Sequence, residues 1–160
     1  MSAFPIVTYI TDTTQIPIEE ILDRATRSLD GVAIIVRDKQ LSLEARMTLA
    51  MEIRAWDAAL AAPPTGLFSV PPLGDLAPAL EWASELGIDG LHFASAAWSR
   101  EAAALARVRL LRDPGRGRPP WISVACHSPA EAGARAEQGA NVLVLSPIFE
   151  SPGKGLPLGL

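Results

Sequence analysis

Residues 121–146 read WISVACHSPAEAGARAEQGANVLVLS, and this stretch decides the fold class. A short, mostly apolar run is followed by an alanine-rich helical segment, a glycine and a second apolar run. Ser128 offers an N-cap oxygen, Pro129 suits the first helical position, and Glu131 completes a capping box. The stretch therefore predicts a strand, a helix with a defined start, and a second strand.

The same order of elements recurs along the chain, which is typical of a parallel sheet with crossover helices. Six strands are predicted, at residues 6–10, 32–37, 66–70, 89–93, 121–125 and 141–146. Three helical segments are followed by a glycine where a left-handed cap is expected, namely Gly31, Gly87 and Gly139. Periodicity alone leaves open a doubly wound sheet or part of an eight-stranded barrel. The segment TDTTQIP after the first strand lacks a glycine-rich dinucleotide turn.

The composition bounds the protein class. A chain of 160 residues that is 49% hydrophobic and 20% charged suits one globular domain over residues 1–160. A net charge of -4, with scattered lysine and arginine, argues against a nucleic-acid or membrane partner and favours a small molecule. The single cysteine cannot form an intramolecular disulfide, and no basic leader or membrane-length apolar run is present. These features predict a cytoplasmic protein.

Two cations follow the second predicted strand, in VRDKQLS. Alternation along a strand sends Arg37 and Lys39 to one side and Asp38 to the other. Two cations at the carboxyl end of a strand suit a phosphate or carboxylate. The alternative is a solvated pair at a loop edge.

Two further positions are candidates for ligand binding. His92 ends the fourth predicted strand, where barrels and open sheets both place their sites, although a lone strand histidine is more often structural. Gly90 would let another backbone or a ligand come close. The segment SPIFESPGKG, with Lys154, has the composition of an anion-gripping loop and equally of a disordered tail. No HxxxH pattern or acidic cluster supports a metal site.

Cys126 and His127 are neighbours at the end of the fifth predicted strand. Neighbouring strand side chains point to opposite faces, so a thiolate-imidazole pair is not expected. Cys126 is better explained as a small buried hydrophobe. His127 precedes a helix N-terminus, which disfavours the imidazolium and keeps the ring able to accept a proton.

Five segments together resemble the thiamine phosphate synthase and thiazole tautomerase family in order and spacing: YITD, VRDKQLS, GIDGLHFAS, SVACHSPAEAGARAEQGAN and LSPIFESPGKG. The resemblance covers nearly the whole chain and implies a (β/α)8 TIM barrel with its site at the carboxyl face of the strands. The family continues with a helix and two strands beyond the point where this sequence ends. We therefore expect about six βα units of an incomplete barrel, whose two open edges a homo-oligomer would cover.

The resemblance implies two activities. The synthase branch joins a pyrimidine diphosphate to a thiazole phosphate with Mg²⁺, and Arg37 and Lys39 match its diphosphate-binding residues. This chain has Ser69-Val70 in place of the synthase Asn-Asp, and residues 95–97 in place of Gln-x-Asp, so oxygen ligands for Mg²⁺ are lost. The tautomerase branch needs no metal, shifts a proton on a thiazole carboxylate phosphate, and has an acid/base histidine that matches His127.

Three functional hypotheses follow. The first is a tautomerase-like isomerase without a cofactor, with His127 as the catalytic residue. The second is a Mg²⁺-dependent synthase that keeps Arg37, Lys39 and Lys154 as diphosphate contacts. The third is a non-catalytic barrel relative that binds a phosphorylated ligand or a partner. In the first two hypotheses, the substrate phosphate is expected to meet Arg37, Lys39, His92 and Lys154.

Overall fold

The computed structural model describes residues 7–26, 32–57, 65–70, 76–111, 119–149 and 157. Six strands lie in these ranges: β1 Val7–Ile10, β2 Val32–Val36, β3 Thr65–Val70, β4 Gly90–Phe93, β5 Trp121–Cys126 and β6 Val142–Leu145. The helices are α1 Ile18–Thr26, α2 Leu43–Asp57, α3 Leu76–Glu85, a 3-10 turn η2 Ser95–Ala97, α4 Arg100–Leu111 and α5 Pro129–Glu137. All six predicted strands are present, with ends that differ by about one residue.

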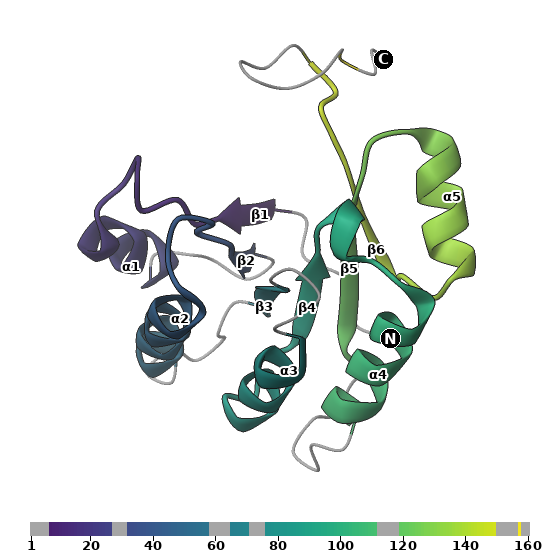
Figure 1. The fold of residues 1–160 in the computed structure, drawn as a ribbon. Coiled ribbons are helices and arrows are strands. Elements are labelled where there is room, and N and C mark those ends of the chain that lie inside the picture. The colour runs from purple at the N-terminus through teal and green to yellow at the C-terminus, as the bar shows by residue number, and fades with distance from the viewer. Residues whose placement is uncertain are drawn as a thin grey trace.

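The strands form one parallel sheet in the order β1-β2-β3-β4-β5-β6 (Figure 1). A doubly wound sheet reverses its strand order at a switch point, whereas a barrel adds each new strand beside the last. The sequential order therefore identifies part of a TIM barrel. β1 and β6 are the two edges, and they do not pair with each other in the described part of the chain.

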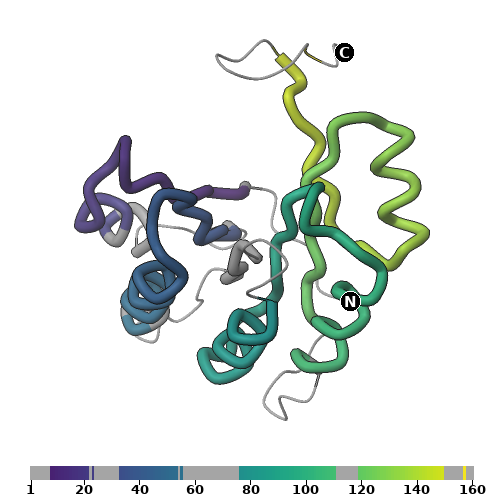
Figure 2. Tube along the Cα trace, in the orientation of Figure 1, coloured from purple at the N-terminus to yellow at the C-terminus, as the bar shows by residue number. Residues whose placement is uncertain are grey.

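The helices cover one side of the curved sheet, and the chain path in Figure 2 follows the same repeated turn from strand to helix and back. This arrangement results from right-handed crossovers between neighbouring parallel strands. Among the described helices, none is long and apolar enough to cross a membrane.

Serine hydroxyls start three of the helices. The Oγ atoms of Ser42, Ser99 and Ser128 accept the N–H three residues later at 3.1, 3.0 and 3.1 Å. Each hydroxyl satisfies a backbone donor that would otherwise lack a partner in the first turn. At the other end of α3 and α5, Gly87 and Gly139 have φ angles of 60° and 104°, as the sequence predicts. Gly31 lies outside the described residues.

The two faces of the sheet pack differently because strand side chains alternate. The outward face packs against the helices through a large apolar cluster that includes Ile34, Leu91, Phe93, Ile122 and Val124. The inward face holds a second, smaller cluster, in which Trp121 packs on buried Ala33 and Ile35. His92 and Ser123 are also buried, and they alternate with members of the outward cluster.

Candidate functional site

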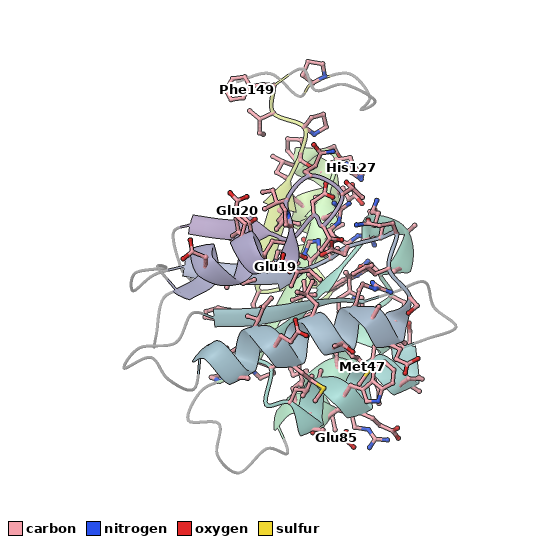
Figure 3. The ribbon with its side chains drawn as sticks, turned by 90° about the vertical axis from the view of Figure 1, so that its left-hand side faces the viewer. Glu19, Glu20, Met47, Glu85, His127 and Phe149 are labelled. Atoms are coloured by element: carbon pink, nitrogen blue, oxygen red, sulfur yellow. The ribbon has the colours of Figure 1, made fainter. Side chains whose placement is uncertain are left out.

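Parallel strands bring their carboxyl ends to one edge of the sheet, and three predicted site residues lie at or near this edge. Arg37 directly follows β2, His92 is in β4, and His127 directly follows β5. In Figure 3, His127 lies toward the same end of the molecule as Phe149, whereas Glu85, at the end of α3, lies at the opposite end. Lys39 is exposed two residues beyond Arg37. Lys154 lies outside the described residues.

Asp38 ties together the loops that follow β1 and β2. Its carboxylate, 2% exposed, accepts the hydroxyl of Thr11, the N–H of Thr13 and the side-chain amide of Gln40. Burial acts to raise the pKa of Asp38, but the hydrogen bonds from Thr11 and Thr13 outweigh it and lower the pKa. The Thr11 hydroxyl also accepts the N–H of Arg37 at 3.0 Å. This N–H is therefore not used in backbone pairing between strands, and β2 ends at Val36, one residue before the predicted end. Asp38 therefore stabilises the two loops that lie beside Arg37.

His92 is a buried, neutral histidine. Its side chain lies beside Ser123, its register partner on β5, with Nδ1 2.9 Å from Oγ. Burial, followed by the positive charge of Arg37, lowers the pKa of His92 to about 4. At neutral pH an anion near His92 and Arg37 would therefore meet one positive charge, that of Arg37. His92 would offer it a neutral hydrogen-bonding group. The fold thus places Arg37 close enough to His92 for its charge to affect the His92 ring.

The low pKa of His92 makes folding stability depend on pH in a defined window. Between pH 6.5 and about 4 the unfolded chain binds a proton at this ring and the folded chain does not. The unfolding free energy therefore falls as the pH falls, by up to about 3 kcal/mol in total. We expect urea unfolding of the parent to show this decrease in unfolding free energy between pH 6.5 and 4. In a His92→Gln variant the decrease should be smaller by the contribution of His92.

Glutamine keeps a hydrogen-bonding group beside the Ser123 hydroxyl but does not titrate in this range, so the His92→Gln variant isolates the titration of the ring. Parallel curves for the parent and His92→Gln would contradict the assignment of the buried neutral ring.

His127 is held by two contacts at the end of β5. Its backbone N–H donates to Oε2 of Glu131 at 2.7 Å, and its Nδ1 lies 2.9 Å from the carbonyl oxygen of Ser146, which follows β6. A carbonyl oxygen can only accept, so Nδ1 must carry a proton. In the neutral ring Nε2 is then the basic nitrogen, on an exposed side chain. Cys126 points the other way and is fully buried, and burial raises the pKa of its thiol.

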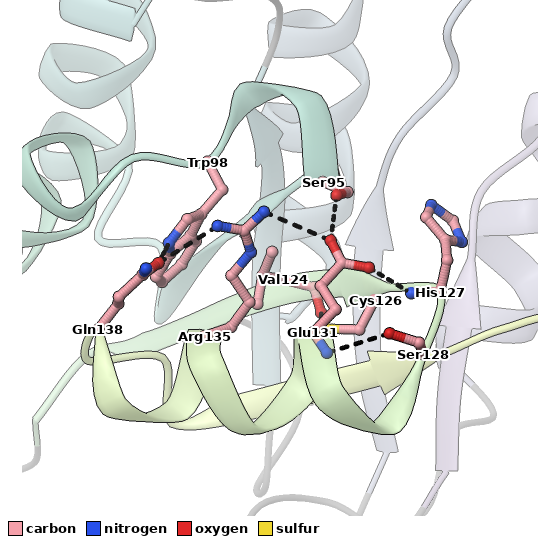
Figure 4. A network of polar contacts seen from close by, with 9 residues as sticks. All are labelled: Ser95, Trp98, Val124, Cys126, His127, Ser128, Glu131, Arg135 and Gln138. Atoms are coloured by element: carbon pink, nitrogen blue, oxygen red, sulfur yellow. Dashed lines mark hydrogen bonds and ion pairs between the residues drawn. The ribbon is translucent and has the colours of Figure 1, made fainter.

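Glu131 lies at the centre of a polar network at the start of α5 (Figure 4). Its Oε1 accepts the hydroxyl of Ser95 from η2 and lies 3.4 Å from Nη2 of Arg135. Its Oε2 accepts the N–H of His127. The hydrogen bond from Ser95, followed by that from His127, lowers the pKa of Glu131. The network connects the ends of β4 and β5 to one helix.

The described residues do not fit a metal ion. No group of three His, Cys, Asp or Glu side chains in the described ranges is placed to bind one. The carboxylates of Asp38 and Glu131 are already engaged by hydrogen bonds. A Mg²⁺ ion needs several oxygen ligands in near-octahedral geometry, and these two groups do not supply them together.

Sequence reasoning did not identify two partners at this edge. Ser123 contacts His92 only because the β4-β5 register sets them side by side, and the register was not readable from the sequence. The carbonyl of Ser146 orients His127 through the backbone, for which no side-chain signal exists.

A separate hollow lies between α3 and α4, on the helical side. It is lined by Leu80, Glu81, Ser84, Glu85 and Arg109. Glu85 lies at the end of the molecule opposite His127 (Figure 3). This hollow therefore does not belong to the carboxyl-edge site.

Comparisons with known proteins agree with the fold. No family model matches the chain, and no curated protein matches it in sequence. A solved structure, a thiamine phosphate pyrophosphorylase from Pyrococcus furiosus, is similar with a TM-score of 0.63 and 14% sequence identity. The similarity covers 90% of this chain and 61% of that structure, so the chain spans about three-fifths of its neighbour. The chain therefore has the fold of part of a (β/α)8 barrel of the kind seen in that pyrophosphorylase.

Proposed function

We propose that this chain acts on a thiazole phosphate and transfers a proton without a metal, as a thiazole tautomerase-like isomerase. The observation that carries the proposal is the contact between Nδ1 of His127 and the Ser146 carbonyl. It leaves Nε2 as the basic atom on an exposed ring at the carboxyl edge of the sheet. The similarity to a thiamine phosphate pyrophosphorylase supports the substrate class.

The proposed reaction needs one base. Nε2 of His127 takes a proton from a ring carbon of the thiazole carboxylate phosphate, and the C–H electron pair moves into the ring. The imidazolium that forms is stabilised by the Ser146 carbonyl at Nδ1. Nε2 then returns the proton at another position, and the product is the aromatic tautomer. No proton, electron or metal is consumed, so a single positioned histidine is sufficient.

The substrate phosphate is proposed to bind on the side of β2 and β4. Arg37 supplies a permanent charge, and Lys39, two residues further along, is an exposed cation near the same loop. His92 is neutral and contributes a hydrogen bond rather than a charge. Lys154 is a further proposed phosphate contact from the sequence pattern. We also propose that residues 1–160 constitute one domain.

The synthase reaction is the second candidate, and the name of the structural neighbour favours it. In this alternative Arg37 and Lys39 contact the diphosphate of a pyrimidine substrate. The described residues lack a set of metal ligands, which is why we rank it below the isomerase.

A direct assay distinguishes the candidates. The chain is incubated either with the thiazole carboxylate phosphate or with pyrimidine diphosphate plus thiazole phosphate, each with Mg²⁺ and with EDTA. We expect isomerisation at equal rates with Mg²⁺ and EDTA, and no thiamine phosphate. Condensation that requires Mg²⁺ would replace the proposal by the synthase. A folded chain that forms neither product would be a non-catalytic relative.

A further inference from the structure

We infer that Glu131, in the first turn of α5, is a positioning residue for His127. The inference rests on the proposed role of His127 as the acid/base. The residues involved are three partners of Glu131, namely Ser95, Ser128 and Arg135 (Figure 4), and Ser146, whose carbonyl oxygen contacts the His127 ring.

The contact between Glu131 and His127 differs from an ordinary capping box. In a capping box the third helical residue returns to the N–H of the N-cap residue. The N-cap here is Ser128, and its hydroxyl accepts the N–H of Glu131 at 3.1 Å. The Glu131 carboxylate instead reaches the N–H of His127, one residue before the cap, at 2.7 Å. The carboxylate of Glu131 therefore binds the residue that follows β5 rather than the N-cap residue of α5.

The Glu131 carboxylate is itself held by further contacts. Its other oxygen accepts the hydroxyl of Ser95 from η2 and lies beside the guanidinium of Arg135. The side chains of Glu131 and Arg135 are only 21% and 22% exposed. Charge-assisted hydrogen bonds of this kind are about twice as strong as neutral ones. Glu131 is thus a rigid support between the loop after β4 and the residue after β5.

The imidazole of His127 depends on two supports. His127 is held at its backbone N–H by Glu131 and at Nδ1 by the carbonyl of Ser146. These supports come from α5 and from the end of β6, on either side of the residue. With both in place, the direction of Nε2 is fixed. Without Glu131, the peptide of His127 can rotate, and the ring loses its alignment with Ser146.

The test compares Glu131→Ala, Glu131→Gln and Ser128→Ala in the isomerase assay. Glu131→Ala should lower kcat by about 10- to 100-fold, the scale of loss from a small misplacement, while KM changes less than about threefold. Glu131→Gln keeps an oxygen for the His127 N–H and should recover most of kcat. Ser128→Ala removes the other half of the cap and should keep kcat within about threefold of the parent, since typical cap losses leave a folded helix in a protein.

A second readout does not depend on activity. Nitrogen NMR of the His127 ring in the substrate-free chain should show a protonated Nδ1 and a basic Nε2 in the parent, in Glu131→Gln and in Ser128→Ala. In Glu131→Ala the two nitrogens should shift toward averaged tautomers. If the parent shows no isomerase activity, the proposed function fails, but the ring spectra still decide whether Glu131 positions His127.

Three results would overturn the inference. They are a parent-like ring spectrum in Glu131→Ala, equal kcat losses in Glu131→Ala and Ser128→Ala, and no recovery in Glu131→Gln. If Glu131→Ala does not fold, Ser95→Ala takes its place, because it removes one support of the carboxylate and leaves the helix cap intact. It should shift the His127 ring in the same direction by a smaller amount, and an unchanged ring would also overturn the inference.

Discussion

Replacing His127 by glutamine is expected to lower kcat for thiazole isomerisation by about 10²- to 10⁴-fold, the usual contribution of a general base. Glutamine fills similar space but has no group that accepts a proton at neutral pH. KM should change little, because the exposed ring follows β5 while the proposed phosphate contacts lie along β2 and β4. Steady-state kinetics at saturating and at low substrate separate the two effects.

A His127→Asn variant separates proton transfer from local structure. The asparagine amide can replace Nδ1 as a donor to the Ser146 carbonyl, but it also lacks a base. Equal losses in His127→Gln and His127→Asn would assign the effect to proton transfer. If either variant turned over substrate at the rate of the parent, His127 would not be the base.

Much of the local structure was predictable because its causes are local. The start of α5 follows from Ser128, Pro129 and Glu131, and the structure places the helix there. The same serine signal precedes α2 and α4, at Ser42 and Ser99, and would have fixed those starts as well. Alternation predicted that Cys126 and His127 point to opposite faces, and Cys126 was interpreted as a small buried hydrophobe. In the structure Cys126 is buried and His127 is exposed.

The strand order was not predictable from periodicity. An open doubly wound sheet and a barrel use the same βα units, and they differ only in which strands become neighbours. That choice depends on contacts between distant segments, such as β1 with β2 and β5 with β6. The resemblance to a barrel family supplied it, and the sequential order of the sheet confirms it.

For the candidate site residues, the position in the fold was predictable from the sequence, but their hydrogen bonds were not. Strand ends identify where Arg37, His92 and His127 lie, since parallel strands share a carboxyl edge. The partner of His92 depends on strand register, and the partner of His127 is a backbone carbonyl. Neither leaves a pattern in the sequence. The reach of Glu131 to His127, beyond the cap, likewise requires the three-dimensional turn between β5 and α5.

Replacing Gly90 by alanine is expected to destabilise the fold by more than about 3 kcal/mol, above the usual range for one added methyl group. Gly90 is the register partner of Trp121, and the two strands approach closely at this pair. A Cβ at Gly90 would meet the carbonyl oxygen of Trp121 and would lie 2.6 Å from its Cβ and 2.8 Å from its carbonyl carbon. These are mainly backbone atoms, which cannot move aside as a flexible side chain can. Urea unfolding measures the loss.

The same substitution at Gly133 provides a matched control with the opposite sign. Gly133 is exposed within α5, and a Cβ there meets no atom within 4 Å. Alanine should stabilise this helix by about 0.5–1 kcal/mol, because glycine loses more backbone entropy on folding. Equal effects at the two sites would contradict the close approach of Trp121 to Gly90. Opposite effects would show that Gly90 is required by the pairing of β4 with β5, which also sets His92 beside Ser123.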